Sequence, residues 1–332
     1  MAQKQAMVGT IGAGVCLWLS ACGGSDTDGL SGEIKVNGSS TVFPISQLVA
    51  EEFGAANPGV NITVGSEGTG SGFQKFIAGE TAVSNASRSI KPGEHQQLVE
   101  ENIPYIELPI AYDGLSIIVH KNNTWADQLT VEQLERIFRS EHRGEVSLWS
   151  DIDPSWPKQE IKRFIAGTHS GTFDYFKEVI ADEGSIRPDV TATENDNEII
   201  NGVSGEPHAI GFLGAAYYFA SRDKVRAVPI VNRDGVPTQP TPESIESGDY
   251  NPFSRPLFIY VRVDALDRPE VSAFVDFYLQ DAGEFAEEVG YVALPKLIYD
   301  RGKTNVLSRK SGTQYVSSDG EKIQGPVTEV YQ

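Results

Sequence analysis

The chain has 332 residues, of which 39% are apolar and 22% are charged, so it is long enough for one large or two medium-sized domains. Its 46 Asp and Glu residues outnumber its 27 Lys and Arg residues and give a formal net charge of −19 at pH 7. This charge excludes a general nucleic-acid binder, which needs a basic surface, and it disfavours electrostatic docking on anionic lipid.

Residues 1–22 have the layout of a secretory signal peptide. Lys4 gives a positive start, and an uncharged stretch from Met7 to Leu19 is too short to span a bilayer. The last four residues, LSAC, resemble the bacterial lipobox, which implies cleavage before Cys22 and lipid attachment to its thiol; a plain signal peptide with a chance cysteine is the alternative. We expect a lipid-anchored protein of the periplasm or cell surface, with residues 23–32 as a flexible tether.

Short apolar strands alternate with amphipathic helices along the rest of the chain, which predicts an α/β fold. In chain order, the pattern predicts a strand at 34–36, a helix from Pro44, a strand at 60–64, a helix through 73–77, two apolar runs within 105–120, a helix after Thr130, a strand at 161–166, a helix through 173–180, a strand at 256–262 and a helix from Pro269. The chain after about Leu307 is polar, and we expect it to be loosely packed.

Three turns rich in Gly and Ser or Thr each follow a predicted strand and precede a predicted helix. They are residues 38–41 (GSST), 68–72 (GTGSG) and 168–172 (THSGT). The first N–H groups of a helix have no partner within it and the helix dipole is positive there, so such turns bind anions well. Each turn alone could simply cap its helix. Three of them at the carboxyl ends of strands predict a shared cage of neutral donors for an anion.

Other chemistry is poorly supported. The chain has no GxxxxGK[ST] loop and no GxSxG turn, and GTGSG matches the dinucleotide motif GxGxxG poorly. No cysteine follows Cys22, and the five histidines are scattered without metal-ligand spacing. Only His169 lies in one of the three turns, where it could equally face solvent. We therefore expect no cofactor, no metal and no enzymatic activity.

Arg88 lies in a polar loop after a short predicted strand. A guanidinium group matches a tetrahedral oxyanion with two parallel hydrogen bonds, so Arg88 is a candidate anion clamp. The alternative is an ordinary surface arginine.

Five motifs together resemble the phosphate-binding proteins of bacterial Pst-type ABC importers. They are GSSTVFPI at 38–45, GTGSG at 68–72, NASRSIK at 85–91, SGTFDYF at 170–176 and AIGF at 209–212. They occur in that family's order and with comparable spacing, and the likeness covers about residues 33–300. The resemblance implies a type II periplasmic-binding fold, in which two α/β lobes are joined by two crossing strands, here near 112–114 and 255–260. Lobe I would comprise 33–112 and 256–332, and lobe II 113–255.

The resemblance also implies a function and a set of ligands. The protein would be a monomer that closes its cleft on inorganic phosphate and delivers it to the membrane subunits of an ABC permease. The implied phosphate-binding residues are Ser40, Thr41 and the Val42 amide in the first turn, Thr69 or Ser71 in the second, and Ser170, Gly171 and Thr172 in the third.

The chain departs from the best-known members of this family at two positions. Those members have an aspartate where Arg88 stands, and an arginine a few residues before the third turn, where residues 166–167 are Ala and Gly. The chain thus resembles the branch whose guanidinium comes from the Ala-Ser-Arg loop, although His169 stands where that branch often has Asp.

The phosphate proton provides a basis for selectivity. Phosphate near neutral pH carries at least one proton and sulfate carries none, so a carboxylate acceptor in a dry site would favour phosphate. Asp113, and Asp196 with Asn197, are the candidate acceptors, although each could be a simple turn residue.

The alternatives to a phosphate receptor are a receptor for sulfate or another tetrahedral oxyanion, a phosphate sensor and a secreted phosphatase. A phosphatase would need a metal cluster or an activated nucleophile, and the sequence offers neither.

Overall fold

The computed structural model describes residues 29–168, 170–181, 184–193 and 195–332. The predicted signal peptide, Cys22 and His169 lie outside these ranges, as does most of the predicted tether. Strand β1 (Ser31–Gly38) already begins at Ser31, where it pairs with Gly59 of β2 (Gly59–Val64), so the folded part starts before the predicted end of the tether at residue 32. None of the described helices is both long enough and apolar enough to cross a membrane.

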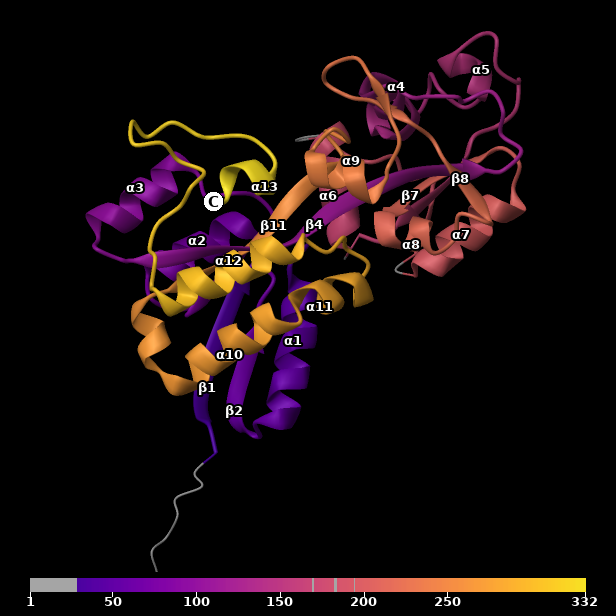
Figure 1. The fold of residues 1–332 in the computed structure, drawn as a ribbon. Coiled ribbons are helices and arrows are strands. Elements are labelled where there is room, and N and C mark those ends of the chain that lie inside the picture. Colours follow the sequence, from indigo (N-terminus) through magenta and orange to yellow (C-terminus); the bar gives the residue numbers. More distant parts are fainter. Residues whose placement is uncertain (1–28, 169, 182–183, 194) are drawn as a thin grey trace, which may run out of the picture.

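The first of two lobes is built on a sheet with the strand order β2–β1–β3–β11–β4 (Figure 1). β3 (Val83–Ala86) is parallel to β1, and β11 (Ser254–Arg262) runs antiparallel to β3 and to β4 (Tyr105–His120). Side chains along β11 alternate between two cores: Ile259 contacts one core and Tyr260 the other. This period of two is expected for a strand with both faces covered. The helices on one face are α1 (Phe43–Ala56), α10 (Pro269–Gln280), α11 (Ala282–Glu288) and α12 (Lys296–Leu307), and those on the other are α2 (Thr69–Ile77) and α3 (Pro92–Glu100).

The second lobe continues the sheet in the order β4–β7–β5–β6, with β8 also paired to β4. Its core contains the aromatic group Phe138, Phe176 and Phe212, in which the rings of Phe176 and Phe212 stack at 3.8 Å between centroids. The strands are β5 (Lys162–Ala166), β6 (Thr191–Thr193), β7 (Ala209–Gly214) and β8 (Val225–Ala227), and the helices are α4 (Val131–Phe138), α5 (Trp149–Ile152), α6 (Gly171–Ile180), α7 (Asp196–Gly205), α8 (Ala215–Phe219) and α9 (Pro242–Ser247). The remaining short elements are the 3-10 helices at Ser140–His142 and Asp264–Asp267, the strands β9 (Ile230–Val231) and β10 (Pro237–Thr238), and α13 (Val327–Val330).

One long strand, β4, belongs to the sheets of both lobes. Residues 105–114 of β4 pair with β11, and residues 115–119 of the same strand pair with β7. The two apolar runs predicted within 105–120 are therefore one continuous strand, which is buried over nearly its whole length because both of its faces are covered. Where β4 leaves the first sheet, Asp113 lies opposite Arg255 of β11.

The predicted α/β pattern is confirmed by these elements. Every predicted strand and helix is present within a few residues of its expected bounds. The capping box at α4 is also present, since Thr130 Oγ1 accepts from the Gln133 N–H at 3.1 Å and Gln133 Oε1 accepts from the Thr130 N–H at 3.0 Å.

The C-terminal segment, residues 311–332, is packed more closely than its polar composition predicts. Tyr315, Val327 and Tyr331 are buried against the body of the protein. Glu107 of β4 holds the segment, because its carboxylate accepts from Thr313 Oγ1 at 2.7 Å and from the Gln314 N–H at 3.3 Å. The expectation of loose packing is wrong because a few well-spaced apolar side chains and one buried acceptor are enough to fix the segment.

Glu107 is only 2% exposed, and it also accepts a hydrogen bond from Tyr260 Oη at 2.9 Å. Burial raises the pKa of its carboxyl group to about 7, against the opposing effect of these donors. Because the pKa is higher in the folded than in the unfolded chain, the stabilising contribution of this group is complete below the unfolded-state pKa of about 4.3 and is lost as the pH rises through 7.

We predict that Glu107→Gln removes this part of the pH dependence of stability. Between pH 5 and pH 8 the natural chain should lose on the order of 3 kcal/mol relative to the variant. Thermal or urea unfolding at several pH values measures this difference. Glu321→Gln, at an exposed position of the same segment, is the control and should leave the pH dependence unchanged. Parallel pH profiles for Glu107→Gln and the natural chain would contradict the prediction.

Candidate anion-binding site

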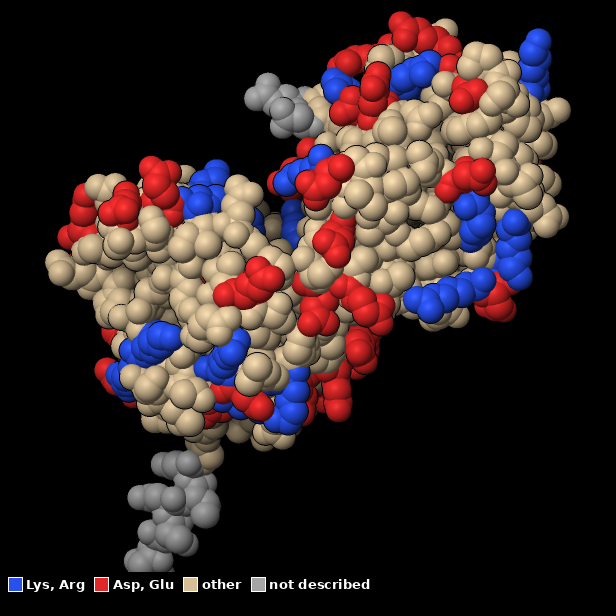
Figure 2. All heavy atoms as spheres, turned by 45° about the horizontal axis from the view of Figure 1, so that its top comes forward, with Lys and Arg blue, Asp and Glu red and all other residues tan. Residues whose placement is uncertain are grey.

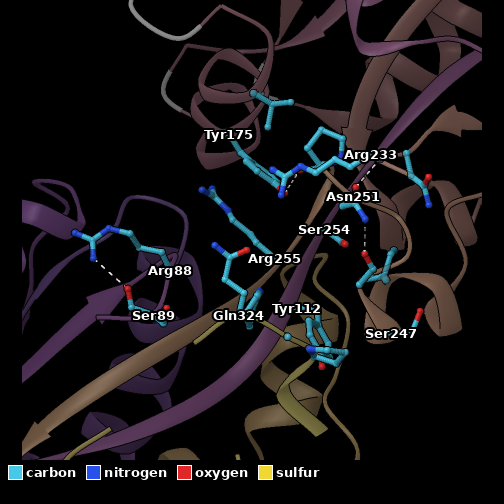
Figure 3. A pocket seen from close by; sticks show the side chains of 18 of the residues that line it. Arg88, Ser89, Tyr112, Tyr175, Arg233, Ser247, Asn251, Ser254, Arg255 and Gln324 are labelled. Atoms are coloured by element: carbon cyan, nitrogen blue, oxygen red, sulfur yellow. Dashed lines mark hydrogen bonds between the residues drawn. The ribbon is translucent and has the colours of Figure 1, made fainter. Parts of the chain in front are cut away.

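Two adjacent cavities lie between the lobes, in the hollow visible in Figure 2. The inner cavity has a volume of about 230 Å³ and is lined by Ser39, Ser40, Thr41, Gly68, Thr69, Ser87, Arg88, Asp174, Glu178 and Arg255. The outer cavity, of about 1100 Å³, shares four of these residues and extends past β11 to the C-terminal segment. Figure 3 shows Arg88 on one side of the outer cavity, Arg255 with Tyr175 on the other, and Gln324 of the C-terminal segment beside them. The inner cavity is the candidate site because it gathers residues of the first two predicted turns together with Arg88.

The first turn is positioned by the close approach of two strands. Gly38, at the end of β1, has a φ of +144°, and a Cβ there would lie 2.1 Å from the Asn85 carbonyl oxygen of β3. Only glycine permits this approach. The chain then turns so that Ser40 and Thr41 face the inner cavity, and Val42 is buried at the start of α1.

The second turn contributes a threonine. Of the two residues that the sequence left open, Thr69 lines the inner cavity and Ser71 lines neither cavity. The Thr69 hydroxyl accepts from the Ser87 N–H at 3.2 Å and lies 3.2 Å from Ser87 Oγ. This contact links the second turn to the loop that carries Arg88.

The third turn caps its helix and touches the first turn. Ser170 Oγ accepts from the Thr172 and Phe173 N–H groups at 3.1 and 3.4 Å, as an N-cap does. A Cβ on Gly171 would lie 2.6 Å from Thr41 Cα, so only a glycine lets α6 approach the first turn this closely. Ser170, Gly171 and Thr172 line neither cavity in this arrangement of the lobes.

Arg88 lines the inner cavity, but its guanidinium group is already paired with a carboxylate. Its Nη1 and Nη2 donate to the two carboxylate oxygens of Glu94 at 2.9 and 2.8 Å, and its guanidinium lies over the Phe73 ring. Glu94 is itself fixed, because it also accepts from the Lys91 N–H at the start of α3. The carboxylate that holds Arg88 is thus Glu94.

Asp113 pairs instead with Arg255. Arg255 Nε lies 3.3 Å from Asp113 Oδ2, its Nη2 donates to Thr41 Oγ1 at 3.0 Å, and its guanidinium stacks on the Tyr175 ring at 3.7 Å. Burial raises the pKa of the Asp113 carboxyl to about 6, although the positive charge of Arg255 opposes the shift. Arg255 therefore supplies a second positive charge to the inner cavity.

A hydrogen bond between the lobes completes the site. Ser40 Oγ, in the first turn, donates to Asp174 Oδ2 in the first turn of α6 at 2.8 Å. Asp174 and Glu178 are one helical turn apart, and both face the inner cavity. The cavity thus contains hydroxyl groups, two guanidinium groups and two carboxylates. Within the described ranges, no three His, Cys, Asp or Glu side chains are placed to hold a metal ion.

Comparisons with known proteins identify the family. A family model described as PBP superfamily domain matches residues 23–282. The chain belongs to the PBP superfamily. SphX of Synechococcus elongatus is 41% identical to this PBP chain over 282 residues, which are 85% of this chain and 83% of SphX. The phosphate-binding protein PstS of Staphylococcus saprophyticus is 40% identical over 301 residues, which are 90% of this chain and 92% of PstS.

A solved structure matches the PBP fold closely. It is described as a possible phosphate binding protein from Planctomyces limnophilus and is 44% identical to this chain, with a TM-score of 0.80. The match covers 99% of that protein and 84% of this chain. The predicted resemblance to PstS-like proteins and the type II periplasmic-binding fold are both confirmed.

The structure of this chain also brings to the site three residues that the sequence did not predict. Arg255, Asp174 and Glu178 line the inner cavity, but none belongs to a Gly- and Ser/Thr-rich turn. Asp174 could have been noticed, because it lies within the SGTFDYF motif. Asp196 and Asn197, the other predicted acceptors, line neither cavity, and the Asn197 N–H donates to Asn195 Oδ1 in an ordinary helix cap at the start of α7.

Proposed function

We propose that this protein is an extracytoplasmic receptor that binds inorganic phosphate in the inner cavity and delivers it to the membrane subunits of an ABC importer. The observation that carries the proposal is the meeting of two guanidinium groups, Arg88 and Arg255, with the hydroxyls of the first two turns in one small cavity. Guanidinium and hydroxyl donors are the groups that recognise a tetrahedral oxyanion. The similarity to the phosphate-binding protein PstS of Staphylococcus saprophyticus supports the same ligand.

The two crossing strands suggest how the site closes on its ligand. β4 belongs to both sheets, and the chain returns to the first lobe where β11 begins, so a small change in twist at these two crossings moves α6 relative to the first turn. Gly171 of the third turn already packs against Thr41 here, so an opening movement would separate the two turns to admit phosphate, and closure would restore this contact around the anion. Water leaves the site as it closes, and hydrogen bonds to the anion strengthen in the lower dielectric. Ligand capture and release then need no enzymatic step.

Asp174 is the proposed acceptor of the phosphate proton. Its carboxylate already accepts a hydrogen bond inside the inner cavity, from Ser40. Asp113 is less suited, because it is 1% exposed and lies behind Arg255. A sulfate ion has no proton to donate and would face the Asp174 carboxylate unpaired, which is costly in a closed site.

A titration with two anions tests the proposed function. Calorimetry on the chain without residues 1–22 should show phosphate binding at about one ion per chain, and sulfate should bind weaker by orders of magnitude, because only phosphate can donate to Asp174. Equal affinity for the two anions would contradict the proton-acceptor argument. Binding of neither anion would contradict the proposed function itself.

The two cavity arginines should both contribute to phosphate affinity. Removing one partner of a buried charge pair typically costs about 2–5 kcal/mol, so Arg88→Ala should weaken phosphate binding at least ~30-fold. Arg255→Lys keeps a positive charge beside Asp113 but cannot contact Thr41 in the same geometry, and it should also weaken binding. Arg233→Ala, at the wall of the outer cavity only, is the control. An Arg88→Ala variant with the affinity of the control would show that Arg88 does not contact the ligand.

The N-terminal segment completes the proposed function. Cleavage before Cys22 and acylation of its thiol would anchor a monomeric receptor to the membrane, and the residues that follow would tether it. Such an anchor keeps the receptor close to its permease.

Cys22→Ser tests this anchor. The variant should appear in the soluble fraction or remain unprocessed, because its acylation site is gone. Fractionation of cells followed by immunoblotting measures the change, and Cys16→Ser is the matched control that should stay membrane-bound. Membrane attachment of Cys22→Ser at the level of the control would show that LSAC is a chance match.

A further inference from the structure

Arg255 has three hydrogen-bonding partners, and they differ in how easily each can leave. Nε lies against Asp113, Nη2 donates to Thr41, and Nη1 donates to Glu178 Oε2 at 2.9 Å. The Asp113 side chain is 1% exposed, whereas the Glu178 side chain is 69% exposed. Asp113 is also fixed by its place on β4, opposite Arg255 in the strand register. Glu178, by contrast, projects from the solvent-exposed face of α6.

Separating Glu178 from Arg255 costs little on the carboxylate side, because the Glu178 side chain is 69% exposed and water solvates the separated carboxylate well. The Arg255–Glu178 pair can therefore open at low cost, while the Arg255–Asp113 pair cannot. The Arg88–Glu94 pair cannot open in the same way, because the Glu94 side chain is only 19% exposed and also accepts a hydrogen bond from the Lys91 N–H. Of the two arginines that line the inner cavity, only Arg255 has an exchangeable partner.

We propose that Glu178 is an exchangeable counter-ion of the anion site: its carboxylate occupies the Nη1 position of Arg255 when the cavity is empty, and an entering anion must displace it. The proposal rests on the proposed function. It assigns Glu178 a role in specificity. A simple anion such as acetate offers Arg255 nothing that the Glu178 carboxylate does not, so it cannot displace it. A tetrahedral oxyanion has further oxygens for the hydroxyls of Ser40 and Thr41, which Glu178 does not contact, and it therefore can displace Glu178.

The test compares two glutamates that border the same cleft. Glu178→Gln removes the charge that contacts Arg255, whereas Glu246→Gln removes an equal charge at the outer cavity wall. Calorimetric titration of the full chain with inorganic phosphate at physiological salt should show about threefold to tenfold tighter binding for Glu178→Gln than for the natural chain. Glu246→Gln should stay within about twofold, because salt screens charges that make no direct contact. Glu178→Ala should match Glu178→Gln and excludes a residual hydrogen bond from the glutamine.

A competition experiment reads out specificity. Millimolar acetate should weaken phosphate binding to Glu178→Gln and leave binding to the natural chain unchanged. Unchanged or weaker phosphate affinity in both Glu178 variants, or an equal gain in Glu246→Gln, would overturn the proposal while the proposed function stands. Failure of the natural chain to bind phosphate at all would overturn both.

Discussion

The ion pair between Arg255 and Asp113 joins the two strands that cross between the lobes. Arg255 lies opposite Asp113 in the register of β11 and β4, at the point where β4 leaves one sheet for the other. From this position the Arg255 side chain reaches the first turn at Thr41 and helix α6 at Glu178. The Arg255 guanidinium thus contacts both crossing strands and both walls of the inner cavity. A site at this junction is affected by any movement of one lobe relative to the other.

Carboxylates hold both cavity cations in place before any ligand enters. Glu94 holds Arg88, and Asp113 holds Arg255. A buried unpaired guanidinium would be costly, so these partners make it possible to keep two positive charges in a closing cleft. The arrangement also suits a chain with a net charge of −19, because binding depends on short-range donors and long-range repulsion is screened beyond about 8 Å at physiological salt.

Much of the fold and part of the site could be predicted from local patterns. The alternation of apolar strands and amphipathic helices and the capping box at Thr130 depend on residues close together in the chain, and the structure confirms them. The turns at Thr41 and Thr69 are equally local, and both residues line the inner cavity. The position of Asp196 away from both cavities and the packing of the C-terminal segment were less predictable. Tyr331 donates to the Glu107 carbonyl oxygen, 224 positions earlier, and the Tyr315 ring packs against Phe258 of β11. No local sequence periodicity predicts such contacts.

The sequence by itself determined the family, the α/β architecture and the hydroxyl-rich turns, because each depends on a short motif whose residues carry their own conformational preference. Only the tertiary structure decided which charges meet. Arg255 and Asp113 are 142 positions apart, and the register of β11 against β4 places them face to face. Glu94 rather than a distant aspartate holds Arg88, since the start of α3 folds back over the loop. Side-chain pairing in a cleft follows from strand register and helix docking, and those are set by packing across the whole chain.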